Sequence, residues 1–410
     1  MYQESKLDNG IKIITLLDNN APAVTLAYLI KCGSFNEDKN NLGIAHFTEH
    51  MLFKGTLNRT SDKINWDIEN LGGLLNAETF FNYTKYYCTV PYEYWKIGLD
   101  VLSDIIWFNT IPENEFNKEK QVILEELKMY EDDSQSKVFE LLMQQLNKND
   151  INRQLVGGTT QTVSKIKHKQ MIDFIDQNYN PDNVVIIATG NIEHNEIVNF
   201  IDNFCKDIDF KKSLIKSSLF EFKINTDYVE NIEKKEITQS HLCWGLFGPK
   251  PSIDEIYTLN IISTLLGGNS SSILYQIIRE QMGLVYTVYT NVMNLGDTSI
   301  FYGYAGLDQK NIKKVKDIIF KELLKLQTNL IDDDKLEFIK RYIKGTYALY
   351  QEKTSGKNDV ICQCIINDLN YNNYIENINK VTKEDIKIFA QKYFSKDAIQ
   401  FTQILPKNNF

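Results

Sequence analysis

Two stretches of this 410-residue chain, which lie about 214 residues apart, share one pattern of residues. Residues 174–190 (FIDQNYNPDNVVIIATG) and residues 388–404 (IFAQKYFSKDAIQFTQI) each read as a helix that is followed by an apolar strand. The strand candidates at 24–32 and 239–247 are separated by a similar offset. Any chain that alternates strands and helices produces weak echoes of this kind. Matching offsets at both ends nevertheless favour an internal duplication into two similarly folded halves.

The length of the chain agrees with such a duplication, because 410 residues exceed a single compact core and suffice for two or three domains. Strand and helix patterns fill the first half and start again with the strand at 239–247, whereas residues 206–238 are polar and rich in lysine. We therefore predict an N-terminal domain at 1–212, a linker at 213–230 and a homologous C-terminal domain at 231–410.

Short runs rich in apolar and β-branched residues predict strands, and longer runs with a helical period predict helices. Asn9 and Gly10 form a dipeptide that is typical of a tight turn, so residues 7–15 are expected to form a hairpin. This alternation of strands with long helices predicts α+β domains in which helices are layered on a sheet. Further strands are expected at 24–32, 82–90, 183–189, 239–247, 286–291 and 300–305. Helices are expected at 43–53, 65–71, 92–108, 113–130, 167–178, 254–266, 311–327 and 333–349.

The composition excludes several classes of protein. The formal net charge is −9, from 45 Lys and Arg against 54 Asp and Glu, whereas a nucleic-acid binder needs a basic face. No apolar run approaches the roughly 18 residues that span a bilayer, and the N-terminal residues fit neither a signal peptide nor an organellar presequence. The 6 cysteines are widely scattered, which indicates reduced thiols. We therefore expect a cytoplasmic protein with no nucleic-acid or membrane partner.

Histidine is scarce, with 5 residues in the chain, yet His46 and His50 lie close together within GIAHFTEHMLF. Residues i and i+4 of a helix lie on one face, so both imidazoles can bind one metal ion. Glu49 immediately precedes His50 and projects beside the metal, where it can hold a water molecule. This spacing is the H-x-x-E-H arrangement of the inverzincins, and it predicts a zinc site with Glu49 as the base that activates water.

A catalytic zinc ion takes three protein ligands and keeps a fourth position for water, so a third ligand is needed. The helix expected at 113–130 carries Glu119, Glu125 and Glu126. Glu119 and Glu126 share a helix face, whereas Glu125 points away from it. One ligand and one supporting carboxylate suit such a pair, but the spacing alone does not decide which is which. An acidic helix face that is merely solvated has the same pattern.

Several segments resemble the family of pitrilysin, insulin-degrading enzyme and the mitochondrial processing peptidase. GIAHFTEHMLFKGT is similar to the signature of that family, and NLGGLLNAETFFNYTKYYCTV, EKQVILEELKMYEDD and YNPDNVVIIATGNI are similar to further segments of it. The resemblance therefore covers nearly the whole chain. It implies that His46, His50 and Glu126 bind Zn²⁺ and that Glu119 is the supporting carboxylate, which chooses between the two glutamates that spacing leaves open.

The second half contributes a further part of the resemblance. Residues 279–286 (REQMGLVY) are similar to an R-x-x-x-G-L-x-Y segment of the family, which implies that Arg279 and Tyr286 reach the substrate backbone from the second domain. Read alone, Arg279 would be expected to pair with a carboxylate and Tyr286 to be a core aromatic of a strand. Residues 257–268 (YTLNIISTLLGG) contain no histidine, so we expect one zinc ion per chain. Residues 154–163 lack the basic residue that follows the first glycine in the family.

The resemblance also implies a fold and an activity. The fold would consist of two homologous α/β-layered domains from the internal duplication, each a mostly antiparallel sheet covered by helices, and together they would form half of a clamshell. The activity would be that of a zinc-dependent endopeptidase, with Glu49 as general base, acting on unfolded peptides or precursor segments in a closed chamber. Asn76 and Ala77 are the candidates for binding an extended peptide along a strand.

Half-length members of the family assemble in pairs, which implies a homodimer or a heterodimer with an inactive homologue. The alternative interpretation is a non-catalytic partner subunit or scaffold of a related peptidase complex. That alternative predicts a broken motif, and His46, Glu49, His50 and Glu126 are all present.

Overall fold

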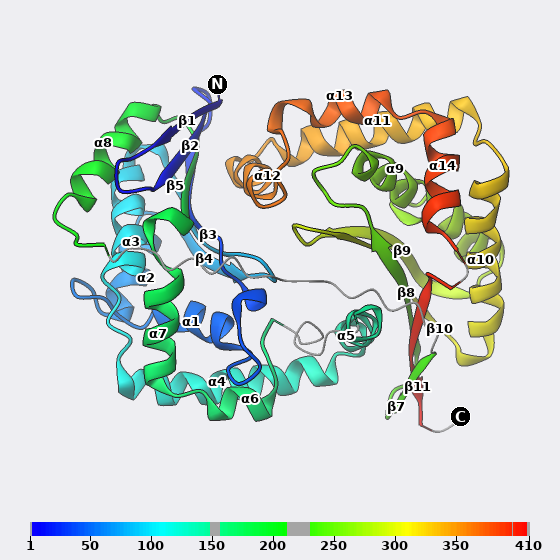
Figure 1. Ribbon diagram of the computed structural model, residues 1–410, viewed down its shortest axis with the longest axis horizontal. Coiled ribbons are helices and arrows are strands. Elements are labelled where there is room, and N and C mark those ends of the chain that lie inside the picture. The colour runs from blue at the N-terminus through cyan, green and yellow to red at the C-terminus, as the bar shows by residue number, and fades with distance from the viewer. Residues whose placement is uncertain (1, 148–155, 211–229, 396, 408–410) are drawn as a thin grey trace. The chain divides into compact units, whose positions relative to one another are not determined.

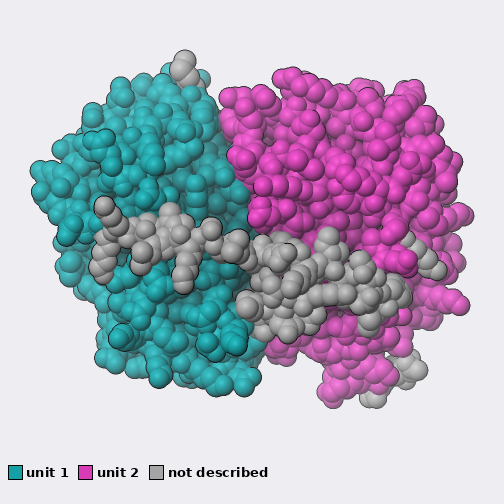
Figure 2. Space-filling model, viewed as in Figure 1, with its two compact units in different colours: residues 1–128, 154–220, 349–366 teal, residues 129–153, 221–348, 367–410 magenta. Residues whose placement is uncertain are grey.

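The computed structural model describes residues 2–147, 156–210, 230–395 and 397–407. The chain divides into two compact units, which are coloured separately in Figure 2. The linker predicted at 213–230 lies outside the described residues except for Glu230. Unit 1 consists of Met1–Lys128, Gln154–Phe220 and Leu349–Ile366, and unit 2 consists of Met129–Arg153, Glu221–Ala348 and Asn367–Phe410.

Unit 1 is built on a six-stranded sheet with the order β1-β2-β6-β3-β5-β4 (Figure 1). Neighbouring strands are antiparallel except β2 and β6, which are parallel. The turn at Asn9 and Gly10 joins β1 to β2, so the hairpin spans residues 2–17 and is longer than the predicted 7–15. The strand predicted at 24–32 is β3, which is buried along nearly its whole length. The strands are β1 (Tyr2–Lys6), β2 (Lys12–Leu17), β3 (Ala23–Ile30), β4 (Leu74–Thr79), β5 (Thr84–Pro91) and β6 (Val184–Gly190).

Helices cover both faces of this sheet. α3 packs on β3 and β5, where Leu26 and Tyr28 enter the hydrophobic core, while α12 packs over β3 and β6. Thr25 points to the opposite face of β3 from Leu26, and its hydroxyl oxygen lies 2.9 Å from that of Thr354 in α12. The helices are α1 (Ile44–Leu52), α2 (Ser61–Glu69), α3 (Trp95–Trp107), α4 (Glu113–Asp132), α6 (Thr160–Lys165), α7 (His168–Asn178), α8 (His194–Cys205) and α12 (Thr354–Ile366).

Unit 2 is built on a five-stranded sheet with the order β7-β11-β8-β10-β9. β7 and β11 are parallel, and the other neighbours are antiparallel. The strands are β7 (Asn231–Lys235), β8 (Ser240–Gly248), β9 (Val285–Asn294), β10 (Ser299–Leu307) and β11 (Gln400–Pro406). The helices are α5 (Ser134–Leu146), α9 (Glu255–Gly267), α10 (Ile312–Thr328), α11 (Asp333–Tyr350), α13 (Tyr374–Lys380), α14 (Lys383–Tyr393) and the π-helix Tyr275–Gln281.

The two sheets share one topology. The strands β2-β6-β3-β5-β4 of unit 1 and β7-β11-β8-β10-β9 of unit 2 have the same order along the chain, and in both sheets one parallel pair is followed by three antiparallel pairs. The predicted fold class of two homologous, mostly antiparallel sheets with helical layers is therefore confirmed. Among the described residues, no helix combines the length and the apolar composition that a bilayer crossing requires.

The two halves of the chain exchange one helix each. α5 follows α4 in the first half but packs on β8 and β11, where Thr402 donates a hydrogen bond to the carbonyl of Val138 at 2.9 Å. α12 comes from the second half but packs on the sheet of unit 1, where Asn358 donates to the carbonyl of Ile187 at 3.2 Å. The predicted domains at 1–212 and 231–410 are continuous, whereas each compact unit contains a helix from the other half. Neither α5 nor α12 is among the helices expected from the sequence, and a helical pattern would not indicate which sheet buries its face.

The contact between Gly303 and Trp244 gives a test of the packing in unit 2. A Cβ atom on Gly303 would lie 2.2 Å from the indole ring of the cross-strand residue Trp244, which is fully buried. We expect Gly303→Ala to lower the free energy of unfolding by about 1–3 kcal/mol, because the indole must shift in a packed core. Gly345→Ala is the matched control: that glycine lies within α11 with open space around it, so alanine should stabilise by about 0.5–1 kcal/mol. Equal effects of the two substitutions in denaturant titrations would contradict this packing.

Candidate metal centre

Helix α1 carries the histidine pair, and the buried carboxyl group of Glu37 fixes its N-terminus. Gly43 is the N-cap residue at φ +93°, a conformation that favours glycine. Glu37 accepts hydrogen bonds from the backbone N–H groups of Gly43 and Ala45, both at 2.8 Å. Burial raises the pKa of Glu37 to about 8, although both N–H donors favour the carboxylate. Glu37 is absent from the predicted site because it precedes the helix by more residues than a capping box allows.

The two sides of α1 divide between the core and the site, as the predicted spacing requires. His46, Glu49 and His50 are partly exposed on one side of the helix. The other side enters the hydrophobic core of unit 1, so the helix cannot rotate without exposing apolar surface. Its buried residues are Ile44, Ala45, Phe47, Thr48, Met51 and Leu52.

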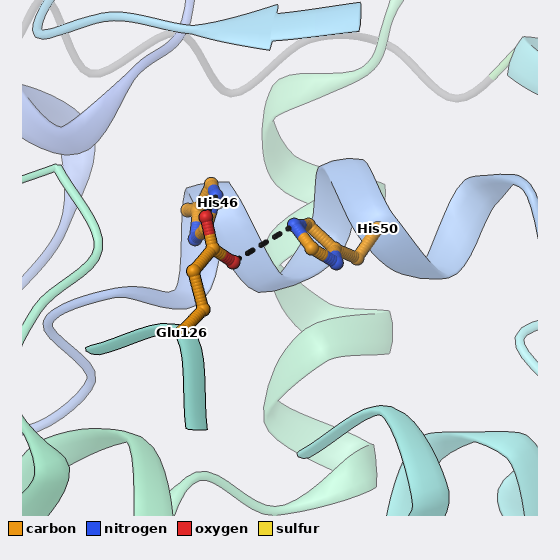
Figure 3. A group of neighbouring side chains, drawn as sticks. All are labelled: His46, His50 and Glu126. Atoms are coloured by element: carbon orange, nitrogen blue, oxygen red, sulfur yellow. Dashed lines mark ion pairs between the residues drawn. The ribbon is translucent and has the colours of Figure 1, made fainter. Parts of the chain in front are cut away.

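Three side chains that were predicted as metal ligands converge in unit 1 (Figure 3). The Glu126 carboxylate on α4 lies between the two imidazoles: Oε1 is 4.0 Å from His46 Nε2, and Oε2 is 3.6 Å from His50 Nε2. One ligand atom from each residue lies within 4.8 Å of the others. Two imidazole nitrogens and one carboxylate form a donor set that suits zinc, and a catalytic site keeps a fourth position free.

Glu119 orients His50 from the side away from Glu126. Glu119 Oε1 lies 3.0 Å from His50 Nδ1, and Lys54 Nζ lies 2.7 Å from Glu119 Oε2. A carboxylate accepts from Nδ1–H, which leaves the lone pair of His50 on Nε2, the atom that faces Glu126. Burial would raise the pKa of Glu119, but its hydrogen bonds with His50 and Lys54 outweigh burial and lower it. Lys54 was not predicted, since a lysine beyond the helix end carries no signal of this role.

The electrostatics of the centre favour a positive charge between the histidines. Burial, and then the neighbouring His50, lower the pKa of His46 to about 4, so His46 is a neutral donor near pH 7. Burial would also lower the pKa of His50, but Glu119, Glu49 and Glu126 outweigh it and raise that pKa. A metal cation can supply the positive charge that these carboxylates favour. His46 Nδ1 is buried and has no hydrogen-bond partner among the described residues.

Glu49 lies beside the three converging residues and contacts the edge strand. Thr79, the last residue of β4, donates a hydrogen bond from its hydroxyl to Glu49 Oε2 at 2.5 Å. Burial raises the pKa of Glu49, and the hydrogen bond from Thr79 only partly offsets that effect. A carboxyl group with a raised pKa suits proton transfer near neutral pH. Thr79 was not predicted, because only the fold brings it to Glu49.

β4 is an edge strand of the sheet in unit 1. Among the described strands it pairs only with β5, and its residues alternate between exposed and half-buried positions. Asn76 is exposed, and its Oδ1 accepts a hydrogen bond from the backbone N–H of Ala77 at 2.9 Å. An extended peptide that pairs with this edge would replace that contact.

The loop before α6 closes over the start of α1. A Cβ atom on Gly157 would lie 3.0 Å from Leu127 Cδ2 and 3.8 Å from His46 Nδ1. A Cβ atom on Gly158, which has φ +69°, would lie 2.4 Å from the carbonyl oxygen of Leu42. The glycine pair therefore lets the backbone approach helix α1 closely. Gly157 and Gly158 belong to residues 154–163, the segment that departs from the family pattern. Residues 154 and 155 lie outside the described part of the chain.

Arg279 and Tyr286 belong to unit 2. The guanidinium carbon of Arg279 lies 4.7 Å from the ring centroid of Tyr275, and both residues are in the π-helix, a form found often at functional sites. Arg279 forms no ion pair with any described residue. Tyr286 is 77% exposed at the start of β9, so it is not a core aromatic. The missing ion pair of Arg279 among the described residues and the exposure of Tyr286 argue against the interpretation that Arg279 pairs with a carboxylate and Tyr286 is a core aromatic.

The other three histidines have local partners. His194 contacts the hydroxyls of Ser5 and Thr15, His168 contacts the carbonyl of Ile111, and His241 contacts the hydroxyl of Tyr304. They form no further metal-ligand group within the described ranges.

Comparisons with known proteins relate the chain to peptidases. The family model described as insulinase (peptidase family M16) matches residues 12–159, and the model described as the peptidase M16 inactive domain matches residues 165–343. The chain is 32% identical to the uncharacterised zinc protease YmxG of Bacillus subtilis, over 96% of this chain and 97% of that one. It is 29% identical to a zinc protease of Rickettsia felis, over 96% and 95% of the two chains. A protease from Helicobacter pylori has the same fold, with a TM-score of 0.91, 20% identity and 99% coverage of both chains.

The geometry assigns different roles to the glutamates of α4, which can be tested by zinc affinity. We expect Glu119→Gln to weaken zinc binding by about 10- to 100-fold in a competition with a chromogenic chelator, because a neutral amide oxygen accepts more weakly from His50 Nδ1–H and makes the imidazole a poorer donor. Glu125→Gln is the matched control on the same helix: its carboxylate is exposed and pairs with Lys128, so zinc affinity should not change. Unchanged affinity in Glu119→Gln would contradict the supporting role of Glu119.

Proposed function

This chain belongs to the insulinase family of peptidases, M16, and we propose that it is a zinc-dependent endopeptidase that hydrolyses unfolded peptides or precursor segments. The observation that carries the proposal is the convergence of His46, His50 and Glu126, with Glu49 beside them. The names of the relatives support zinc as the metal, and the donor set is the one that zinc prefers.

His46, His50 and Glu126 would hold one zinc ion per chain. Bound there, zinc would polarise the scissile carbonyl and make water more acidic. His46 is suited to bind because burial keeps it neutral, and His50 because Glu119 occupies its other nitrogen. The His50–Glu119–Lys54 contacts would keep that imidazole aligned through the reaction.

Glu49 would carry the proton through the reaction. The oxygen of a water molecule attacks the carbonyl carbon while Glu49 accepts one proton of that water. Glu49 then gives this proton to the nitrogen of the breaking C–N bond, which releases an amine and a carboxylic acid. The hydrogen bond from Thr79 holds Oε2, so Oε1 remains for the transfer.

Binding of the substrate would involve both units. Main-chain groups of the peptide would pair with the edge strand β4 at Asn76 and Ala77, which gives affinity with little demand on sequence. Tyr286 and Arg279 of unit 2 would donate hydrogen bonds to the peptide carbonyl in the transition state. The exposure of Tyr286 and the support of Arg279 by Tyr275 are the observations that favour these roles.

Mutation of the base and of a ligand separates catalysis from metal binding. We expect Glu49→Gln to retain stoichiometric zinc but to lower kcat on an unfolded fluorogenic peptide by about 100- to 10,000-fold, because it removes the proton carrier. His50→Ala should lose both zinc and cleavage. Metal analysis and an activity assay with and without a chelator measure both effects.

Near-normal turnover by Glu49→Gln, or cleavage that a chelator does not inhibit, would overturn the proposed mechanism. Zinc binding without any cleavage by the wild-type protein would favour the alternative, a non-catalytic partner subunit or scaffold.

We also propose that a second chain completes the enzyme, as a homodimer or as a heterodimer with an inactive homologue, and that the protein acts in the cytoplasm. The family resemblance supports the pairing. We expect light scattering of the purified chain to give twice its mass of 47.6 kDa, and addition of a homologue to leave activity unchanged. A monomer that becomes active only with a homologue would favour the heterodimer.

A further inference from the structure

The edge strand β4 has two faces with different surroundings. Thr79 contacts Glu49, and Leu75 and Ala77 pack against the hydrophobic core, so this face of the strand is turned to α1. Successive side chains of a strand point to opposite faces, which places Asn76 and Glu78 on the other one. Both are exposed. The side chains of a peptide that pairs with β4 also alternate between the two faces of the sheet. Of the two residues that flank the scissile bond, one therefore presents its side chain on the same face as Glu78.

Glu78 has no cationic partner in the described part of the chain, although a lysine lies directly across the sheet. Lys85 is its cross-strand neighbour on β5, but the Lys85 ammonium pairs with Asp359 of α12 and lies 4.7 Å from the ring centroid of Tyr87. The Lys85 side chain is only 1% exposed, so this pair is buried on the lysine side. Glu78 accepts one hydrogen bond, from the hydroxyl of Tyr83 at 3.3 Å, and forms no ion pair with any described residue.

Asp359, the carboxylate that pairs with Lys85, has both of its oxygens occupied. The second oxygen of Asp359 accepts a hydrogen bond from the hydroxyl of Tyr350 at 2.7 Å. Lys85 and Asp359 therefore cancel each other, and the charge of Glu78 remains on the surface, on the same face of the sheet as Lys85 and the half-buried ring of Tyr87. A surface carboxylate with an aromatic ring on the same face suits a lysine or arginine side chain, whose stem packs on apolar surface while its head meets the charge.

We propose that Glu78 selects a basic side chain next to the scissile bond of the peptide. This inference rests on the proposed function, since it assumes that a peptide pairs with β4. Cross-strand neighbours have Cβ atoms about 4.5–5.5 Å apart, so a lysine or arginine on the bound strand reaches the carboxylate without a change in the backbone. An acidic side chain at the same position is disfavoured by like charge.

A lysine scan of one peptide tests the selection. We would use a quenched fluorescent peptide in which a single lysine moves one position at a time, with glutamine at that position as the neutral reference. The wild-type protein should cleave one lysine position with a kcat/KM about three- to fivefold above the glutamine peptide, as expected for one partly exposed ion pair. The advantage should shrink with added salt.

Variants of Glu78 should change the ratio of kcat/KM between the lysine and glutamine peptides and leave cleavage of the glutamine peptide intact. Glu78→Gln should remove the preference for lysine, and Glu78→Lys should shift it to a glutamate peptide, while kcat/KM for the glutamine peptide changes little. Glu196→Gln removes one exposed carboxylate from α8 and should keep the wild-type ratio, which excludes an effect of net charge alone.

An unchanged lysine-to-glutamine ratio in both Glu78 variants would overturn the selection by Glu78 while the proposed peptidase function stands. A wild-type protein that binds zinc but cleaves none of the peptides would overturn the proposed function instead, and the inference with it.

Discussion

The contact between Glu119 and His50 Nδ1 is the interaction on which the rest of the site depends. It joins α1 to α4, fixes which nitrogen of His50 faces Glu126, and is itself held by Lys54. A buried carboxylate is stable there because two cationic or polar donors occupy its oxygens, which lowers its pKa against the effect of burial. Without this contact the imidazole would be free to rotate, and the three ligand atoms would no longer converge.

The fold supplies the rigidity that this contact needs. One side of α1 is buried in the core of unit 1, Glu37 holds its first N–H groups, and Gly157 lets a loop pack over His46. The edge strand β4 is then tied to the same helix through Thr79 and Glu49. His46, His50, Glu126, Glu49 and the strand edge are therefore positioned by one packed unit, so an extended peptide would meet groups that are already in place.

Much of this could be predicted from sequence, because the signals are local. The i, i+4 spacing of His46 and His50 and the shared face of Glu119 and Glu126 follow from helix geometry alone. The contacts of Glu37, Lys54 and Thr79 could not be predicted, since each joins elements that only the tertiary fold brings together. The exchange of α5 and α12 was missed because neither helix was predicted, and because a helical pattern would not indicate which of the two sheets buries its face.

A crystal structure of the zinc-loaded protein with anomalous scattering at the zinc edge tests the central claim most directly. The account predicts one zinc peak in unit 1, about 2.0–2.2 Å from His46, His50 and Glu126, with Glu119 still on His50 Nδ1 and Glu49 outside the coordination shell. A zinc ion bound by Glu119 in place of Glu126, or a peak elsewhere in the chain at full occupancy, would contradict it.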